Sequence, residues 1–212
     1  IHDDLPCFDN AQTRRGKPSV HRAFGERLAV LGGDAMIVLA FEALARGCEC
    51  APDRLPTLLG IVARAVGTAG GIVAGQAWEC EPSTPLARYQ RAKTGSLFVA
   101  ATMAGAAAAG FASPSAWQRL GECIGEAYQV ADDILDVVGD SAELGKPVGQ
   151  DSTLGRPSAV AQLGLDGAVR SLHALIAEAT DSIPDVGGGD ALRVLIRAQA
   201  ERLLPAQVRR AA

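Results

Sequence analysis

Apolar residues run through the chain in long stretches separated by short polar or Gly/Pro-rich segments, which predicts a series of helices. The clearest covers about 116–138, with Ser113 before it as an N-cap and Pro114 as a first-turn proline. Further helices are expected over about 19–46, 53–78, 167–180 and 190–204, and another follows the turn expected at 82–85 and carries Arg88, Arg91, Lys93 and Thr94.

Glycine and proline mark the expected interruptions, because they favour turns and weaken helix interiors. These are a bend at Gly32-Gly33, a helix start at Pro52 with Asp53 as its N-cap, a loosened helical turn at Gly95, a loop over 139–157 and a break at 187–189.

Composition supports a helical protein. The chain has 212 residues, of which 48% are hydrophobic and only 4% aromatic. Alanine and leucine therefore carry the packing, which favours helices over sheets. Since no internal repeat or linker is visible, we predict one all-α domain over residues 1–212. The net charge of -4 argues against nucleic acid as a partner.

The cysteines are odd in number and no secretory signal precedes them, so we expect free thiols in a cytoplasmic protein. They are Cys7, Cys48, Cys50, Cys80 and Cys123. No second Cys/His pair at a zinc-like spacing supports Cys48 and Cys50 as metal ligands. The most apolar long run, 28–45, contains Asp34 and Glu42, so no membrane span is predicted.

Three carboxylates interrupt the apolar 116–138 helix. At about 100° per residue, Asp132 and Asp136 stack on one face and Asp133 sits beside them. Carboxylates in apolar surroundings repel one another and are costly to desolvate. Mg²⁺ removes that cost, since it takes hard oxygen ligands, keeps several waters and bridges to substrate phosphates. An acidic turn facing water is the alternative for this triplet alone.

A second acidic cluster opens the chain. Asp3 and Asp9 are six residues apart, so a straight helix would put them on different faces. Pro6 disfavours helix before it, so a helix should end near Asp4 and the loop can fold Asp9 back. Two facing clusters could hold more than one Mg²⁺ against a single diphosphate.

In these motifs the chain resembles the trans-isoprenyl diphosphate synthases, or polyprenyl synthetases. Asp3-Asp4-(four residues)-Asp9 is similar to their first aspartate-rich motif, in the longer form of bacterial farnesyl and geranylgeranyl diphosphate synthases. Asp132-Asp133-Ile134-Leu135-Asp136 is similar to the second. The flanking segments follow in the family's order, as Arg14-Arg15-Gly16-Lys17-Pro18, Lys93-Thr94-Gly95, Tyr128-Gln129 and Gly145-Lys146-Pro147-Val148-Gly149-Gln150-Asp151.

The resemblance implies a Mg²⁺ cofactor. The catalytic and metal-binding residues that it implies are Asp3, Asp4, Asp9, Asp132, Asp133 and Asp136. Arg14 would contact the allylic diphosphate and Arg15 the isopentenyl diphosphate. The other substrate-binding residues that it implies are Lys93, Thr94, Gln129, Lys146 and Arg156. The family usually has Lys in place of Arg156 and frequently Asp in place of Asn10.

The implied fold is a single-domain helical bundle around a central active-site cavity, assembled as a homodimer. The implied reaction condenses isopentenyl diphosphate with an allylic diphosphate. The allylic C–O bond ionises, the double bond of isopentenyl diphosphate attacks the cation, and a proton is lost. An apolar, water-poor cavity protects the cation. The expected product is geranylgeranyl or farnesyl diphosphate.

The sequence begins at Ile1, at the expected helix end, so we expect N-terminal helices of the fold to precede it. The family holds isopentenyl diphosphate with a Gly-Gly-Lys-x-x-Arg motif and a His upstream of the first aspartates. We therefore expect residues 1–212 alone not to catalyse chain elongation. A key determinant of product length would also lie upstream, where only Ile1 and His2 remain.

Three other interpretations differ in their motifs. A class I terpene cyclase would share the fold and the ionisation step, but it usually has a single Asp-Asp-x-x-Asp motif. A non-catalytic subunit of a heteromeric prenyl synthase usually loses aspartates, and none is lost here. A helical domain without catalytic function would not carry several motifs in order.

Overall fold

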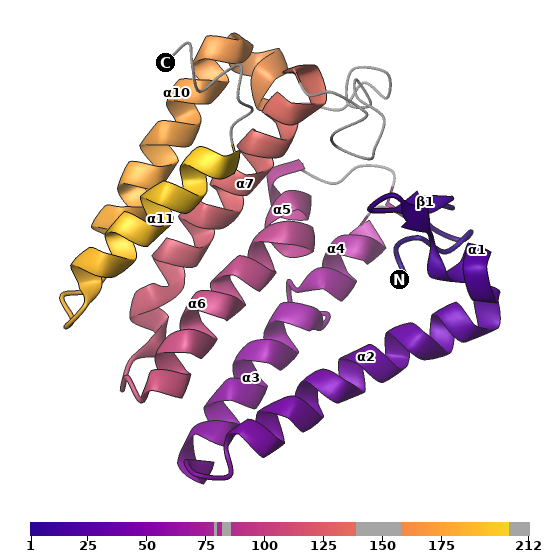
Figure 1. Cartoon of the computed structure of the whole chain (residues 1–212), viewed down its shortest axis with the longest axis horizontal. Coiled ribbons are helices and arrows are strands. Elements are labelled where there is room, and N and C mark those ends of the chain that lie inside the picture. The colour runs from indigo at the N-terminus through magenta and orange to yellow at the C-terminus, as the bar shows by residue number, and fades with distance from the viewer. Residues whose placement is uncertain (79, 82–85, 139–157, 204–212) are drawn as a thin grey trace. The chain divides into compact units, whose positions relative to one another are not determined.

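The computed structural model describes residues 1–78, 80–81, 86–138 and 158–203. Almost all regular structure in this part of the chain is helical (Figure 1), which confirms the predicted all-α fold. Its strands are a short antiparallel hairpin of β1 (Thr13–Arg14) and β2 (Lys17–Pro18). The helices group into two compact units, of which the first comprises residues 1–55. A single domain over 1–212 stays a prediction.

The first unit contains helices α1 (Val20–Phe24) and α2 (Glu26–Gly47). Gly25 separates them, because its φ of +88° is a left-handed conformation that ends α1. The bend predicted at Gly32-Gly33 is therefore wrong. Helix α2 continues through both glycines, and the break lies earlier.

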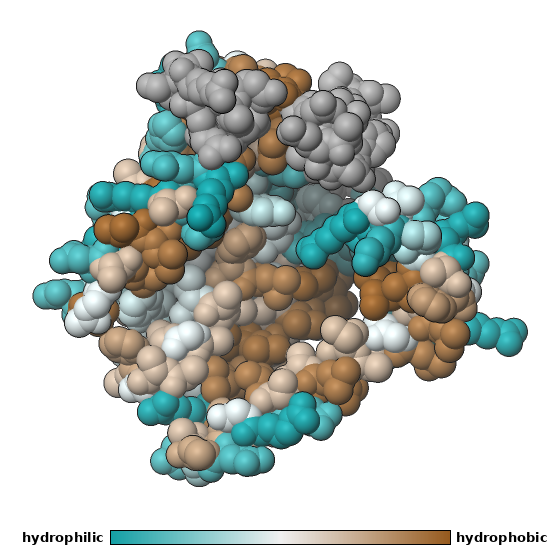
Figure 2. Space-filling model, in the orientation of Figure 1, coloured by the Kyte–Doolittle hydropathy of each residue, from teal (hydrophilic) through white to brown (hydrophobic). Residues whose placement is uncertain are grey.

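Helix α2 exposes most of its large apolar side chains, which contribute to the apolar surface drawn in brown in Figure 2. They are Leu28, Val30, Leu31, Met36, Ile37, Val38 and Leu39. By length and composition α2 could also cross a membrane, although Asp34 and Glu42 lie within it. One such helix is weak evidence of a span, so the absence of a membrane span stays a prediction.

The second unit contains the other described helices, which run side by side (Figure 1). In chain order they are α3 (Leu55–Val66), α4 (Ile72–Trp78), α5 (Leu86–Gln90), the π-helix η2 (Arg91–Gly95), α6 (Ser96–Ala109), the 3₁₀ turn η3 (Pro114–Trp117), α7 (Gln118–Val138), α10 (Ala159–Asp181) and α11 (Gly189–Leu203).

The predicted helix over 53–78 forms, but it is not continuous. A 3₁₀ turn, η1 (Pro52–Arg54), begins it, and Ala51 rather than Asp53 stands at the N-cap. The capping role predicted for Asp53 is therefore wrong. Residues 67–71 then separate α3 from α4.

Helix α7 organises the core of the second unit. Its apolar residues Ala127, Ala131 and Ile134 are buried and pack with Ala168 and Leu172 of α10. Their i, i+4, i+7 spacing gathers them on one face of α7. The acidic residues Asp132 and Asp136 are left on the opposite face, so the same helix forms core on one side and carries carboxylates on the other.

Small residues bring α6 and α7 close together. A Cβ on Gly121 would lie 2.5 Å from the Cα of Val99, and one on Gly125 would lie 3.1 Å from the Cα of Gly95. Contacts this short exclude any side chain larger than hydrogen at Gly121. Helix α7 therefore lies directly on the backbone of α6 and of the π-helix before it.

Candidate active site

The first aspartate-rich segment forms a compact loop in the first unit. The N–H of Asp4 donates to the carbonyl of Ile1 at 3.2 Å, so a turn stands where a helix end was predicted. The N–H of Asp9 donates to the carbonyl of Asp3 at 3.1 Å. The loop after Pro6 therefore folds Asp9 back toward Asp3, as its proline predicts.

Arg14 binds the two carboxylates of this loop. Its Nε donates to Oδ1 of Asp4 at 2.9 Å, and its Nη2 donates to the same oxygen. Nη2 also donates to Oδ2 of Asp3 at 3.2 Å. The hydrogen bond with Asp4 is the largest effect that raises the pKa of Arg14. Arg14 therefore lies on the aspartates, and the diphosphate contact that the resemblance implies for it stays a prediction.

A two-residue hairpin loop positions the basic side chains. Arg14 pairs with Lys17, and the two residues between them have φ of +52° at Arg15 and +73° at Gly16. Positive φ at both positions is typical of a type I′ turn. The loop separates the two arginines, because Arg14 lies on a strand beside the aspartates while Arg15 is exposed at the turn.

The second aspartate-rich segment lies on α7. Asp132 and Asp136 are one helical turn apart on one face, and Gln129 lies on the same face below them. Asp136 is 7% exposed and Asp132 is partly exposed. The spacing therefore places these carboxylates as predicted.

Asp133 has a different environment from its neighbours. Its Oδ2 accepts a hydrogen bond from the N–H of Ala159 at 2.7 Å, and its Oδ1 accepts one from Nε2 of Gln129 at 3.0 Å. Burial raises its pKa, and the two hydrogen bonds oppose that shift. Asp133 thus joins α7 to the first turn of α10. Its metal-binding role stays a prediction.

Lys93 and Thr94 lie in the π-helix, where Gly95 predicted a loosened turn. The turn is held between two helices. A Cβ on Gly75 of α4 would lie 2.6 Å from the backbone nitrogen of Lys93, and Gly125 of α7 faces Gly95 from the other side. The Nζ of Lys93 lies 5.6 Å from the ring centre of Tyr89, within the range of a cation–π contact.

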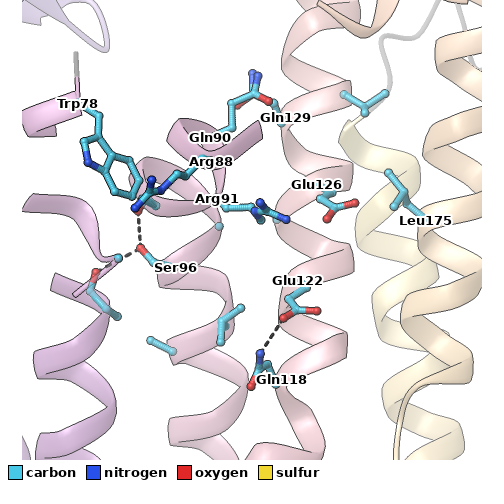
Figure 3. Close-up of a pocket in the computed structure, with 18 of the residues that line it drawn as sticks. Trp78, Arg88, Gln90, Arg91, Ser96, Gln118, Glu122, Glu126, Gln129 and Leu175 are labelled. Atoms are coloured by element: carbon cyan, nitrogen blue, oxygen red, sulfur yellow. Dashed lines mark hydrogen bonds between the residues drawn. The ribbon is translucent and has the colours of Figure 1, made fainter. Parts of the chain in front are cut away.

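A cavity of about 830 Å³ opens in the second unit, lined by residues of α3 to α7 and α10 (Figure 3). Gln129 and Asp133 line it. Most of its wall is small or apolar, including Ile61, Ala65, Val99, Ala100, Met103, Val130 and Leu175. Asp133 is the aspartate of this α7 segment that lines the cavity, so a largely apolar cavity begins next to the acidic segment. Lys146 and Arg156 lie outside the described residues.

Several charged residues of this cavity received no role from the sequence: Arg64, Arg88, Arg91, Glu122 and Glu126. The guanidinium of Arg88 lies 4.3 Å from the centre of the Trp78 ring, and Gln118 donates to Glu122 at 2.7 Å (Figure 3). The spacing of Gln118, Glu122 and Glu126 along α7 could have found the last two, because residues four apart share a face.

The carboxylates fit Mg²⁺ only if a ligand supplies further oxygens. Within the described residues, no three His, Cys, Asp or Glu side chains are grouped closely enough to hold a metal. Mg²⁺ in proteins is usually bound by one or two carboxylates with substrate phosphates and water. Asp132 and Asp136 suit that arrangement, whereas Asp4 is already bonded to Arg14.

Comparison with known proteins identifies the family of the chain. The family model of polyprenyl synthetases matches residues 1–186. A geranylgeranyl diphosphate synthase of Cereibacter sphaeroides is 50% identical over 98% of this chain and 72% of its own. An FPP/GFPP synthase structure from Zymomonas mobilis has a TM-score of 0.76 at 35% identity, covering 93% of this chain and 69% of its own.

A geranyltransferase from Helicobacter pylori, solved with magnesium and isoprenyl diphosphate, has a TM-score of 0.73 at 32% identity. That match covers 95% of this chain and 67% of the other. The chain belongs to the polyprenyl synthetase family. It is a prenyltransferase of the short-chain type, as the synthases that it matches are.

Proposed function

We propose that the protein condenses isopentenyl diphosphate with an allylic diphosphate in a Mg²⁺-dependent reaction. The observation that carries this proposal is the α7 face on which Asp132 and Asp136 stand above Gln129. That face offers hard oxygen ligands beside a cavity whose wall is mostly apolar. A substrate with a diphosphate head and a hydrocarbon tail fits both parts.

The chain's own residues bind the head group and shield the cation. Asp132 and Asp136 would hold Mg²⁺, which supplies Lewis acidity toward the leaving diphosphate. Lys93 would add positive charge for the phosphate oxygens. Apolar side chains such as Val99 and Met103 keep water from the allylic cation. The departed diphosphate serves as the base for the final proton.

We infer a short product, geranylgeranyl or farnesyl diphosphate. The relative at 50% identity is named a geranylgeranyl diphosphate synthase, and the Zymomonas structure is named an FPP/GFPP synthase. Similarity of this degree supports a short-chain product.

The test is product analysis with the intact gene product. Labelled isopentenyl diphosphate is supplied with dimethylallyl, geranyl or farnesyl diphosphate as primer, with Mg²⁺ or with EDTA. We expect labelled geranylgeranyl or farnesyl diphosphate with Mg²⁺ only. In parallel, calorimetry measures binding of inorganic diphosphate under both conditions. Equal affinity in EDTA would contradict a metal-dependent site, and no elongation from any primer would contradict the reaction.

We also infer a cytoplasmic homodimer, which rests on the family resemblance. The exposed apolar side chains of α2 support a second copy as the partner, since large apolar patches mark interaction surfaces. Leu31→Glu should convert a dimer to a monomer in sedimentation velocity, while Arg27→Glu on the same helix should not. A monomeric wild-type protein, or a Leu31→Glu variant that remains dimeric, would contradict this assignment.

A further inference from the structure

We propose that Arg14 competes with Mg²⁺ for Asp4, so that metal and diphosphate can bind the first aspartate cluster well only together. This inference rests on the proposed function and concerns one step within it. Arg14 then has two successive partners. It holds the aspartates first, and it is passed to the diphosphate when the metal takes them over.

The contacts show that Arg14 occupies the ligand atoms themselves. Two of its nitrogens donate to a single oxygen, Oδ1 of Asp4, and one of them also reaches Oδ2 of Asp3. The Asp4 side chain is only 3% exposed. A cation approaching Asp4 therefore meets the guanidinium at the oxygen that it would have to bind.

Burial is unequal across the ion pair, and that asymmetry lets it open. The Arg14 side chain is 52% exposed while that of Asp4 is 3% exposed. The backbone of Arg14 is fixed in the β-hairpin through its pairing with Lys17. The long side chain can therefore rotate into solvent without moving the strand, whereas the carboxylate stays in place.

The balance of charge determines whether Arg14 or Mg²⁺ binds Asp3 and Asp4. One guanidinium balances part of the charge of two carboxylates, and Mg²⁺ would balance both. Two cations at one oxygen repel each other strongly at such short distances. Mg²⁺ alone must therefore displace Arg14 into water, which costs the charge-assisted hydrogen bonds to Asp3 and Asp4.

A diphosphate changes this balance, because it offers the displaced guanidinium a new partner. Arg binds phosphate oxygens two at a time, as it binds a carboxylate. The metal gains phosphate ligands and Arg14 regains its hydrogen bonds. Each ligand then raises the affinity for the other by the same factor, as linkage requires.

The experiment is calorimetric titration with MgCl₂, with and without inorganic diphosphate, on the intact protein. For Arg14→Gln we expect Mg²⁺ alone to bind roughly 5- to 100-fold more tightly than to wild type, the usual range of such couplings. Diphosphate should then raise the Mg²⁺ affinity less than it does in wild type. Arg22→Gln, which removes one exposed positive charge from α1, should leave both quantities as in wild type.

Two further measurements guard against a folding defect, since Arg14→Gln leaves Asp4 buried without its partner. Arg14→Lys keeps the positive charge but loses the planar guanidinium. Its Mg²⁺ affinity should therefore lie between that of the wild type and that of Arg14→Gln. Thermal unfolding should show a larger stabilisation by Mg²⁺ in Arg14→Gln than in wild type. If Arg14→Gln needs Mg²⁺ in order to fold, the metal has replaced Arg14 and the proposal is supported.

Unchanged or weaker Mg²⁺ binding by Arg14→Gln would overturn the proposal, as would an unfolded variant that Mg²⁺ does not restore. These titrations contain no isoprenoid. Failure of the coupling is therefore separate from failure of the proposed reaction, which is judged by incorporation of labelled isopentenyl diphosphate.

Discussion

The imidazole of His2 lies directly on the backbone of α2 at Gly33. A Cβ on Gly33 would come within 2.2 Å of Nε2 of His2, a distance that no real Cβ adopts. The same nitrogen is 3.0 Å from the carbonyl oxygen of Val30 and 3.6 Å from Oδ1 of Asp34. His2 therefore fixes the segment that carries Asp3 to helix α2, and only glycine at residue 33 permits the contact.

We predict that Gly33→Ala displaces His2 and disorders the first aspartate cluster. Because the His2 ring ends a flexible, partly exposed side chain that can move aside, the loss of stability should be no more than about 1 kcal/mol. Its affinity for diphosphate with Mg²⁺ should also fall. Gly32→Ala is the matched control, because nothing lies within 4 Å of a Cβ there. It should gain about 0.5–1 kcal/mol, since alanine is the better helix former. Equal unfolding midpoints for the two variants would contradict the contact.

Asp132→Ala should slow turnover by at least about 100-fold, comparable to losing one strong transition-state contact. Its stability should change little, because Asp132 is partly exposed. The control is Asp53→Ala. Since Asp53 does not cap its helix, this change should leave kcat intact and alter stability by no more than about 0.5 kcal/mol. A wild-type kcat for Asp132→Ala would show that Asp132 has no catalytic role.

Asp133→Ala should mainly affect folding. The change leaves the N–H of Ala159 and the amide of Gln129 without their acceptor, which costs about 1–3 kcal/mol for a buried donor. Asp133→Asn can still accept a hydrogen bond from one of these two donors. Its stability should therefore lie between that of the wild type and that of Asp133→Ala. Urea unfolding measures the difference, with Asp166→Ala on the exposed surface of α10 as control. A stability equal to that of the control would show that the α7–α10 bond contributes nothing.

Cys123 should be the slowest thiol to react. It is fully buried, and burial raises its pKa above the ordinary 9.0. Alkylation followed by mass spectrometry should label exposed Cys50 at least about 100-fold faster. Above pH 9.0 the unfolded chain releases the thiol proton while the folded protein keeps it, so stability should fall as pH rises. Comparable labelling of Cys123 and Cys50 in the native protein would contradict its burial.

The helices and the shared face of the α7 carboxylates were predictable because each depends on local periodicity. The four-residue spacing of Asp132 and Asp136 puts them on one face whatever surrounds the helix. The loosened turn at Gly95 was also predictable, since glycine loses more conformational entropy in a helix than other residues do. These features require only the identity of residues close together in the chain.

The predictions that were wrong or incomplete concern places where residues far apart in the chain contact each other. The Gly32-Gly33 pair indicated a bend, but α2 continues through both residues. The missing side chain of Gly33 instead leaves room for the His2 ring. In the sequence Asp133 is one of three similar carboxylates. In the structure it differs from Asp132 and Asp136 because its Oδ2 accepts a hydrogen bond from the N–H of Ala159. The partner that holds Arg14 could not be inferred from the basic segment, because it comes from the preceding loop. Composition and local spacing do not predict contacts between residues that are far apart in the chain.

The π-helix over Arg91–Gly95 has a consequence for insertions and deletions in this region. A π-turn contains one residue more than an α-turn, so it behaves as a single-residue insertion within a helix. Deleting one residue between Arg91 and Gly95 would restore α-helical geometry. Because the π-turn absorbs the extra residue, the deletion would leave the faces of α5 and α6 in their present orientation. Lys93 would then leave its position over Gly75, although every other side chain of the helix was unchanged.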